Sequence, residues 1–226
     1  VAKNILITCG ATEAITDTYL HLARKAGSTF TVAAFGPAYE SYSRLPMLLG
    51  HRFVELTRDE SDPDFLTKTA DLLVGQGVDL LFVGSPGNPF GQVIPANEVD
   101  FWCQMAAKTS LNVVFDMVYS DLWFDQPVAF PTPVLQERVY IVGSFSTMLS
   151  VTGWRVGWLA APETSITEIG LLHDFAGLSA PHPLQWALSR FLDDKEAVNK
   201  YVSGLRDLIR DSCLTLEGAL VQTGFH

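Results

Sequence analysis

Two residues of this chain have types and positions suited to a charged, partly aromatic ligand. Asp116 closes the apolar run Asn112–Phe115. A carboxylate at the end of a buried strand costs desolvation energy unless a cation or donor faces it, and a protonated ring nitrogen is one such partner. An aspartate that only caps the next turn is the alternative interpretation. Arg155 stands in the run Gly-Trp-Arg-Val-Gly, a poor setting for a solvated ion pair, and arginine binds phosphate through two hydrogen bonds.

Small and hydroxyl-bearing residues supply further phosphate candidates. In the run Cys-Gly-Ala-Thr, Ala11 and Thr12 would open a helix with outward backbone N–H groups, with Thr12 as both cap and hydroxyl donor. A plain capped helix start is the alternative. Ser144 and Ser146 follow a later apolar run, and they and Arg155 can bind the same phosphate that Thr12 faces.

Aromatic and amide side chains follow two other apolar runs. Tyr39 lies in a strand-end turn, where it either stacks on a flat ring or packs a helix against the sheet. Asn88 lies in the Gly- and Pro-rich turn Ser-Pro-Gly-Asn-Pro, where its amide faces a ligand or bonds its own turn backbone. Tyr119 follows Asp116 by three residues.

The elements that must position these residues alternate between strands and helices. The predicted strands are Asn4–Cys9, Phe30–Phe35, Arg52–Leu56, Asp79–Val83, Asn112–Asp116, Val139–Phe145 and Val156–Ala161. The predicted helices between them are Thr12–Ala26, Asp64–Gly75 and Asn97–Lys108. Such alternation predicts an α/β fold with a three-layer αβα arrangement, in which helices cover both faces of a mostly parallel seven-stranded sheet. Ligands of these folds bind beyond the carboxyl ends of the strands, where the candidates lie.

The strands cease after about Ala161, and three helices follow. They are predicted at Ser165–Ala176, Leu184–Leu192 and Ala197–Leu220. A long helix after a finished sheet either connects to another domain or packs across one. We therefore expect one domain over residues 1–192 and a connecting helix over 193–226.

Composition narrows the class of protein. The 226 residues carry 25 acidic against 15 basic side chains, a net charge of −10, which argues against nucleic acid or an anionic membrane as partner. Three cysteines without close spacing suggest neither a metal site nor a disulfide framework. No apolar run reaches the roughly 20 residues of a membrane span, and the first residues lack the features of a signal peptide. A reducing, cytoplasmic setting is expected.

Five motifs occur in an order that resembles one family. They are GATEAI, P-x-Y-x-x-Y, S-P-G-N-P-F-G, D-x-V-Y and S-F-S-x-x-x-S-V-T-G-W-R-V-G. Together they resemble the class I/II aminotransferases, which are pyridoxal-phosphate-dependent enzymes of fold type I. The resemblance implies the large domain of such an enzyme, with amino acid and 2-oxo acid substrates and a homodimeric assembly.

The resemblance also implies a role for each candidate residue. The cofactor phosphate would be held by Ala11, Thr12, Ser144, Ser146 and Arg155. At the ring, Tyr39 would stack on the pyridine, Asp116 would pair with the pyridine N–H, and Asn88 and Tyr119 would hydrogen-bond the phenolic oxygen.

One position departs from the family pattern. The family's Schiff-base lysine lies eight residues before the phosphate arginine, where this chain has Thr147. A hydroxyl neither forms an imine nor carries the proton that the lysine amine transfers, so we expect little or no transamination. Two alternatives stay open: a non-catalytic fold-type I domain that binds cofactor or a partner, and a related β-lyase or synthase.

Overall fold

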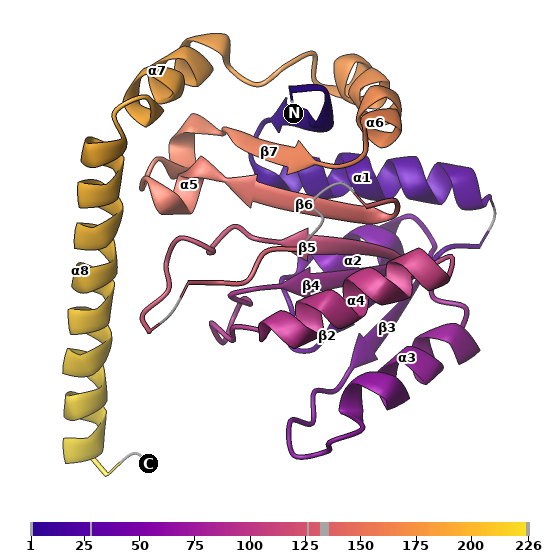
Figure 1. Cartoon of the computed structure of the whole chain (residues 1–226), viewed down its shortest axis with the longest axis horizontal. Coiled ribbons are helices and arrows are strands. Elements are labelled where there is room, and N and C mark those ends of the chain that lie inside the picture. Colours follow the sequence, from indigo (N-terminus) through magenta and orange to yellow (C-terminus); the bar gives the residue numbers. More distant parts are fainter. Residues whose placement is uncertain (1, 28, 126, 132–135, 225–226) are drawn as a thin grey trace.

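A seven-stranded sheet forms the centre of the protein in a computed structural model, which describes residues 2–27, 29–125, 127–131 and 136–224. Val1 and residues 225–226, at the ends of the two expected segments, lie outside the described residues. The strands are β1 Ile5–Thr8, β2 Thr31–Phe35, β3 Arg52–Leu56, β4 Leu80–Gly84, β5 Asn112–Asp116, β6 Val139–Ser144 and β7 Gly157–Ala160. Their spatial order is β1-β7-β6-β5-β4-β2-β3 (Figure 1). The mostly parallel sheet predicted from the sequence is confirmed.

One strand runs against the other six. β7 pairs antiparallel with both β1 and β6, whereas the pairs from β6 through to β3 are parallel. The start of β7 therefore lies at the same edge of the sheet as the carboxyl ends of its neighbours. In the register, Gly157 stands opposite both Thr8 of β1 and Ser144 of β6.

Helices cover both faces of the sheet, which gives the three layers expected. The described helices are α1 Ala11–Ala26, α2 Ser41–Leu48, α3 Phe65–Gly75, α4 Ala96–Lys108, α5 Phe145–Met148, α6 Glu163–Ala176, α7 His182–Leu192 and α8 Lys195–Gln222, with short 3₁₀ turns η1 Ala2–Asn4 and η2 Thr152–Trp154. Buried residues of α3 and α4 pack on one face, and those of α1, α2 and α6 on the other.

The pleat of the central strands explains the two cores. In β4, Leu81 and Val83 belong to the core under α3 and α4, while Leu80 and Phe82 belong to the core under α1 and α2. Successive side chains of a strand point to opposite faces, so a strand covered on both sides must be apolar throughout. This is why these strands could be predicted from uninterrupted apolar runs in the sequence.

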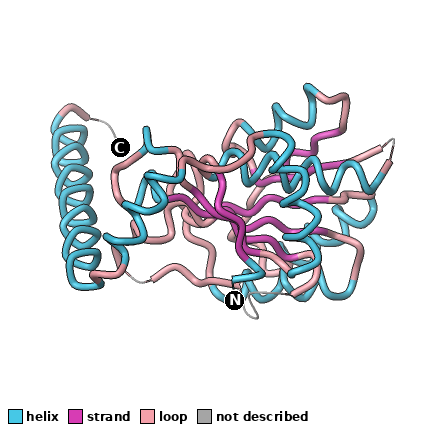
Figure 2. Tube along the Cα trace, turned by 90° about the horizontal axis from the view of Figure 1, so that it is seen from above, coloured by secondary structure: helices cyan, strands magenta, loops and turns pink. Residues whose placement is uncertain are grey.

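The C-terminal helix stands at the edge of the sheet rather than over it (Figures 1 and 2). Of the 28 residues of α8, only Val202 is buried, in a small cluster with Leu149, Val156 and Leu188. Arg206 of α8 also donates to the Asp121 carbonyl at 2.6 Å. The helical C-terminal tail predicted from the sequence is confirmed. None of the described helices is both long and apolar enough to cross a bilayer.

Two short helices were not predicted, and several predicted strand ends differ from the observed ends by one residue. No helix was predicted at α2, whose internal Pro46 interrupts the helical pattern. Phe145 was expected to end a strand, but it opens α5 instead. The reason is local: the Ser144 hydroxyl accepts a 3.1 Å hydrogen bond from the Ser146 N–H and caps that turn.

Candidate active site

Nine of the residues singled out from the sequence line one cavity of about 140 Å³ at the carboxyl edge of the sheet. Six of the strands run parallel, so the loops after β1, β2, β4, β5 and β6 converge there. The reversed β7 adds the loop before it. The nine are Ala11, Thr12, Tyr39, Asn88, Asp116, Tyr119, Ser144, Ser146 and Arg155.

One end of this cavity gathers hydrogen-bond donors. Thr12 is exposed near the start of α1, although Gly10 and not Thr12 is the N-cap residue. Ser146 is buried, and its hydroxyl has no hydrogen-bond partner among the described residues. Buried hydroxyls are normally paired, so an orphan lining a cavity indicates a ligand atom.

Arg155 approaches this end through a close backbone contact. Its Nη2 donates to the Cys9 carbonyl at 3.1 Å, and Nη1 lies 3.3 Å from the Thr152 carbonyl. A Cβ at Gly10 would lie 2.5 Å from Nη2, so only glycine, here with φ of +83°, admits the guanidinium. Arg155 itself adopts a left-handed φ of 53°, a conformation that costs roughly 1–2 kcal/mol for a side-chain-bearing residue. Such strain is retained where the surroundings require it.

The other end of the cavity is a buried carboxyl group. Asp116 is 9% exposed, and it accepts hydrogen bonds from the Tyr42 hydroxyl at 2.6 Å and from the Val118 N–H at 3.1 Å. Burial raises the pKa of Asp116, while the two hydrogen bonds oppose that rise. No described cation lies within ion-pair distance of this carboxylate. A buried carboxylate without a cationic partner is energetically unfavourable, and a cationic ring nitrogen that entered the cavity would supply this partner.

Aromatic side chains connect the two ends. The Tyr39 hydroxyl lies 3.3 Å from the Thr12 hydroxyl, and the Tyr39 ring meets the Tyr42 ring edge-on at 5.6 Å between centroids. Asn88 is exposed on the loop after β4, and Tyr119 is half-buried after β5. These side chains surround a gap with hydroxyl and guanidinium groups at one end and a carboxylate at the other.

Thr147 lies beside this cavity and is not one of the residues that line it. It is half-buried in α5, and its hydroxyl donates a 2.6 Å hydrogen bond to the Val118 carbonyl. Val118 does line the cavity. The Thr147 hydroxyl is therefore committed to the backbone just after Asp116.

The sequence interpretation missed Tyr42, which also lines the cavity. It is buried, and its ring stacks on Phe82 at 4.5 Å between centroids with planes 4° apart. The available signal was its spacing: Tyr42 follows Tyr39 by three residues, which places both on one side of a helix start. Ile15, Gly84, Pro86 and Val118 complete the lining.

The whole chain, residues 1–226, matches the family described as aminotransferase class I and II. It therefore belongs to the class I and II aminotransferase family. Members of this family transfer amino groups between amino acids and 2-oxo acids and depend on pyridoxal 5′-phosphate.

Individual relatives agree with this membership. A probable N-succinyldiaminopimelate aminotransferase DapC of Mycobacterium tuberculosis is 30% identical over 98% of this chain and 55% of the relative. The aspartate aminotransferase of Musicola paradisiaca is 26% identical over 96% of this chain and 55% of the relative. The solved N-succinyldiaminopimelate aminotransferase of M. tuberculosis superposes with a TM-score of 0.84 at 26% identity, covering 99% of this chain and 58% of that one. The chain thus spans just over half the length of these relatives.

The cavity fits the family's cofactor in its donor chemistry. The orphan Ser146 hydroxyl, the Thr12 hydroxyl and Arg155 suit a phosphate. The buried Asp116 carboxylate at the far end suits a pyridine N–H.

Proposed function

We propose that this chain is the cofactor-binding large domain of an aminotransferase, over residues 1–192, and that the segment 193–226, which includes α8, leads toward a smaller domain. It would bind pyridoxal 5′-phosphate yet turn over amino acids and 2-oxo acids slowly or not at all. The observation that carries the proposal is the convergence of nine predicted residues on one cavity beside Thr147. The aminotransferase relatives matched over most of the chain support it.

The phosphate would be held at the start of α1. Ala11 and Thr12 offer backbone N–H groups at the positive end of the helix dipole. The hydroxyls of Thr12, Ser144 and Ser146 would add hydrogen bonds, and Arg155 the opposite charge. Bound there, the cofactor would supply a conjugated ring that withdraws electrons from the substrate's α-carbon.

The ring would lie between Tyr39 and the sheet edge. Tyr39 would stack on one face, while Asp116 would hold a proton on the ring nitrogen. Asn88 and Tyr119 would donate hydrogen bonds to the phenolic oxygen. Tyr42 would keep the Asp116 carboxylate oriented through its 2.6 Å hydrogen bond.

Thr147 would limit the chemistry. The Oγ1 hydroxyl is far too weak a base to take a proton from carbon at neutral pH, and it already donates to the Val118 carbonyl. The chain's own residues would therefore bind and orient a ligand without moving its proton. Thr147 is the one feature that supports the second candidate function, a non-catalytic domain that binds the cofactor, whereas the aminotransferase relatives support the first.

Substrate class, assembly and location belong to the same proposal. The relatives are named for different amino donors, so the proposal commits to amino acids and 2-oxo acids as a class. A homodimer is expected from the family resemblance, and a cytoplasmic location from the few, widely spaced cysteines.

The test compares the unaltered chain with Thr147→Lys. Both should bind pyridoxal phosphate, but only Thr147→Lys should give a borohydride-stable adduct at residue 147, mapped by mass spectrometry. Thr167→Lys is the matched control, because Thr167 is exposed on α6 away from the cavity lining. Absence of the adduct in Thr147→Lys would overturn the assignment of that position. Transamination by the unaltered chain at a rate typical of the family would overturn the proposed loss of turnover.

A further inference from the structure

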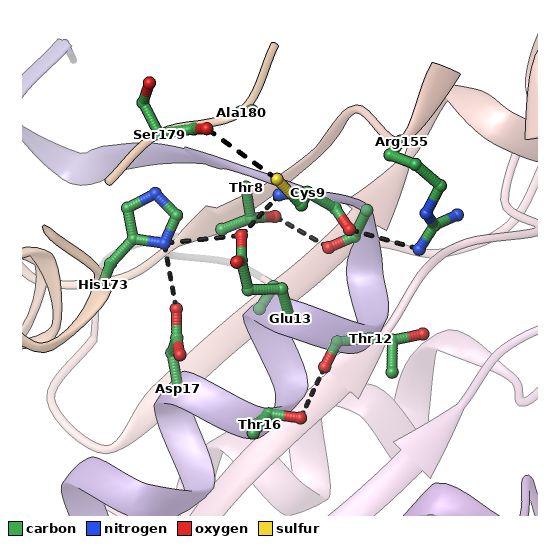
Figure 3. A network of polar contacts seen from close by, with 12 residues as sticks. Thr8, Cys9, Thr12, Glu13, Thr16, Asp17, Arg155, His173, Ser179 and Ala180 are labelled. Atoms are coloured by element: carbon green, nitrogen blue, oxygen red, sulfur yellow. Dashed lines mark hydrogen bonds and ion pairs between the residues drawn. The ribbon is translucent and has the colours of Figure 1, made fainter. Parts of the chain in front are cut away.

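A largely buried group of ionisable side chains, Glu13, Asp17 and His173, lies beside the loop between β1 and α1 (Figure 3). The Glu13 carboxylate accepts a 2.5 Å hydrogen bond from the Cys9 N–H. The same Glu13 oxygen lies 3.4 Å from Nδ1 of His173, and Asp17 lies 3.1 Å from that nitrogen. The group thus ties the loop to α1 and to α6, which packs beside α1.

Because these side chains are largely shielded from water, the contacts within the group must stabilise their polar atoms. The side chains of Asp17 and His173 are 4% and 3% exposed, and that of Glu13 is 22% exposed. Two carboxylates one helical turn apart repel each other in such a setting, and His173 lies between them as the nearest potential cation. Each carboxylate is held where it is by the imidazole and, for Glu13, by the Cys9 N–H.

The Cys9 residue is held from two sides. Its N–H donates to Glu13, and its carbonyl accepts from Arg155 Nη2 at 3.1 Å. Gly10 follows with φ of +83°, and its carbonyl accepts from the Thr8 hydroxyl at 2.9 Å. These contacts set the direction in which the first N–H groups of α1 point.

Glu13 acts without lining the cavity itself. A free carboxylate near a phosphate would repel it, but here the charge is turned toward Cys9 and His173. Gly177 provides the space, since a Cβ there would lie 2.9 Å from the other Glu13 oxygen. The Glu13 oxygen nearest His173 already accepts a hydrogen bond from the Cys9 N–H. A donor at that oxygen indicates a hydrogen-bonded group and not a site for a metal cation.

We propose that Glu13, held by His173, is a positioning residue for the phosphate of the bound ligand. By fixing the Cys9–Gly10 loop it aims the backbone donors of Ala11 and Thr12 into the cavity. The inference rests on the proposed function, because it presumes a phosphate at this end. It predicts that Glu13 contributes to binding of the phosphate and not to binding of the ring.

The experiment measures binding of pyridoxamine 5′-phosphate and of pyridoxamine, neither of which has an aldehyde that reacts with surface lysines. Glu13→Ala should weaken binding of the phosphorylated compound about tenfold, and should leave pyridoxamine binding unchanged. Glu13→Gln should retain affinity within about threefold, because its amide oxygen still accepts from Cys9. Glu163→Ala, an exposed glutamate on α6, is the control that should change neither.

A second variant covers the case in which Glu13→Ala does not fold. Gly177→Ala keeps Glu13 but pushes its carboxylate, so it should show the same selective loss in smaller degree. If Glu13→Ala and Gly177→Ala weaken binding of both compounds equally, or change the binding of neither, the positioning role of Glu13 is overturned while the proposed function stands. Failure of the unaltered chain to bind either compound would instead overturn the proposed function, and this inference with it.

Discussion

The Tyr42 hydroxyl donates a 2.6 Å hydrogen bond to the Asp116 carboxylate, joining α2 to the end of β5. The two residues are 74 positions apart in the chain, and both are buried. Burial, and then the nearby Asp116 charge, raise the pKa of Tyr42 well above its ordinary value. The hydroxyl therefore stays protonated and remains a donor, which keeps Asp116 oriented toward the cavity.

Tyr42→Phe removes this donor and leaves the ring packing on Phe82 intact. A hydrogen bond to a charged acceptor contributes about 1.5–3 kcal/mol, so the free energy of unfolding at pH 7 should fall by roughly that amount. Urea denaturation measures it. Tyr140→Phe is the matched control with a smaller expected effect, since that hydroxyl lies 3.4 Å from Ser165. Equal losses in the two variants would contradict a special role for the Tyr42 bond.

Asp116→Asn replaces the charged carboxylate with a neutral group of nearly the same shape. Without the charge, a protonated ring nitrogen loses its partner, and pyridoxamine 5′-phosphate should bind about 10- to 100-fold more weakly. The drop should appear equally for pyridoxamine, because the ring is affected and not the phosphate. Titration calorimetry measures both. Unchanged affinity would show that Asp116 faces no ligand cation and only terminates its strand.

Gly157→Ala tests the close approach of β7 to the loop between β1 and α1. An added Cβ would lie 2.5 Å from the Gly10 carbonyl carbon and 2.7 Å from the Ala11 nitrogen, and neither backbone atom can move freely. Overpacking of this kind costs about 1–3 kcal/mol, visible as a lower melting temperature by circular dichroism. Gly170→Ala, with open space around it inside α6, should instead be neutral or stabilise by about 0.5–1 kcal/mol. The prediction fails if the two variants shift in the same direction.

His21→Leu tests a pH dependence of stability. His21 is 2% exposed, and neither ring nitrogen has a hydrogen-bond partner among the described residues. Burial, and then the charge of Lys25, lower the pKa of His21, with Arg24 acting the same way and Glu168 opposing. The unfolded chain therefore takes up this proton at higher pH than the folded one. The free energy of unfolding is therefore not reduced by His21 above about pH 6.5. It decreases as the pH falls from there through the lower pKa of the folded state.

Removing the imidazole should remove this loss. Between pH 7.5 and 5.5, the free energy of unfolding should fall less in His21→Leu, by up to about 1.4 kcal/mol per pH unit. Chemical denaturation at the two pH values measures the difference. His182→Leu, at an exposed position on α7, should keep the pH dependence of the unaltered chain. Identical pH profiles in all three proteins would refute the assignment to His21.

Much of the fold was predictable because its signals are local. Every predicted strand has a counterpart, and the central ones are apolar at each position because both faces are covered. The predicted helices also correspond, within a few residues, to α1, α3, α4, α6, α7 and α8. α2 was missed because eight residues with an internal proline carry little helical pattern of their own.

The candidate site divides differently. The residue types after the strands were legible from the chain, but their meeting in one cavity depends on which strands are neighbours. Arg155 shows this best: it precedes a strand, and only the antiparallel β7 places it beside Cys9, about 146 positions away. Tyr42 was missed because its partner Asp116 comes from a distant strand.

By itself, the sequence determined the family and the kind of sheet, and it predicts that Thr147 stands where the family has lysine. These properties follow from residue types and their spacing along the chain, so they can be recognised without knowing which distant segments are in contact. The tertiary structure alone decided that the Thr147 hydroxyl bonds the Val118 carbonyl, that Tyr42 holds Asp116, and that Glu13 and Arg155 hold Cys9 from two sides. Except for the Glu13–Cys9 bond, which spans only four residues at the start of α1, each of these contacts joins segments that only the order and direction of the strands bring within hydrogen-bond distance.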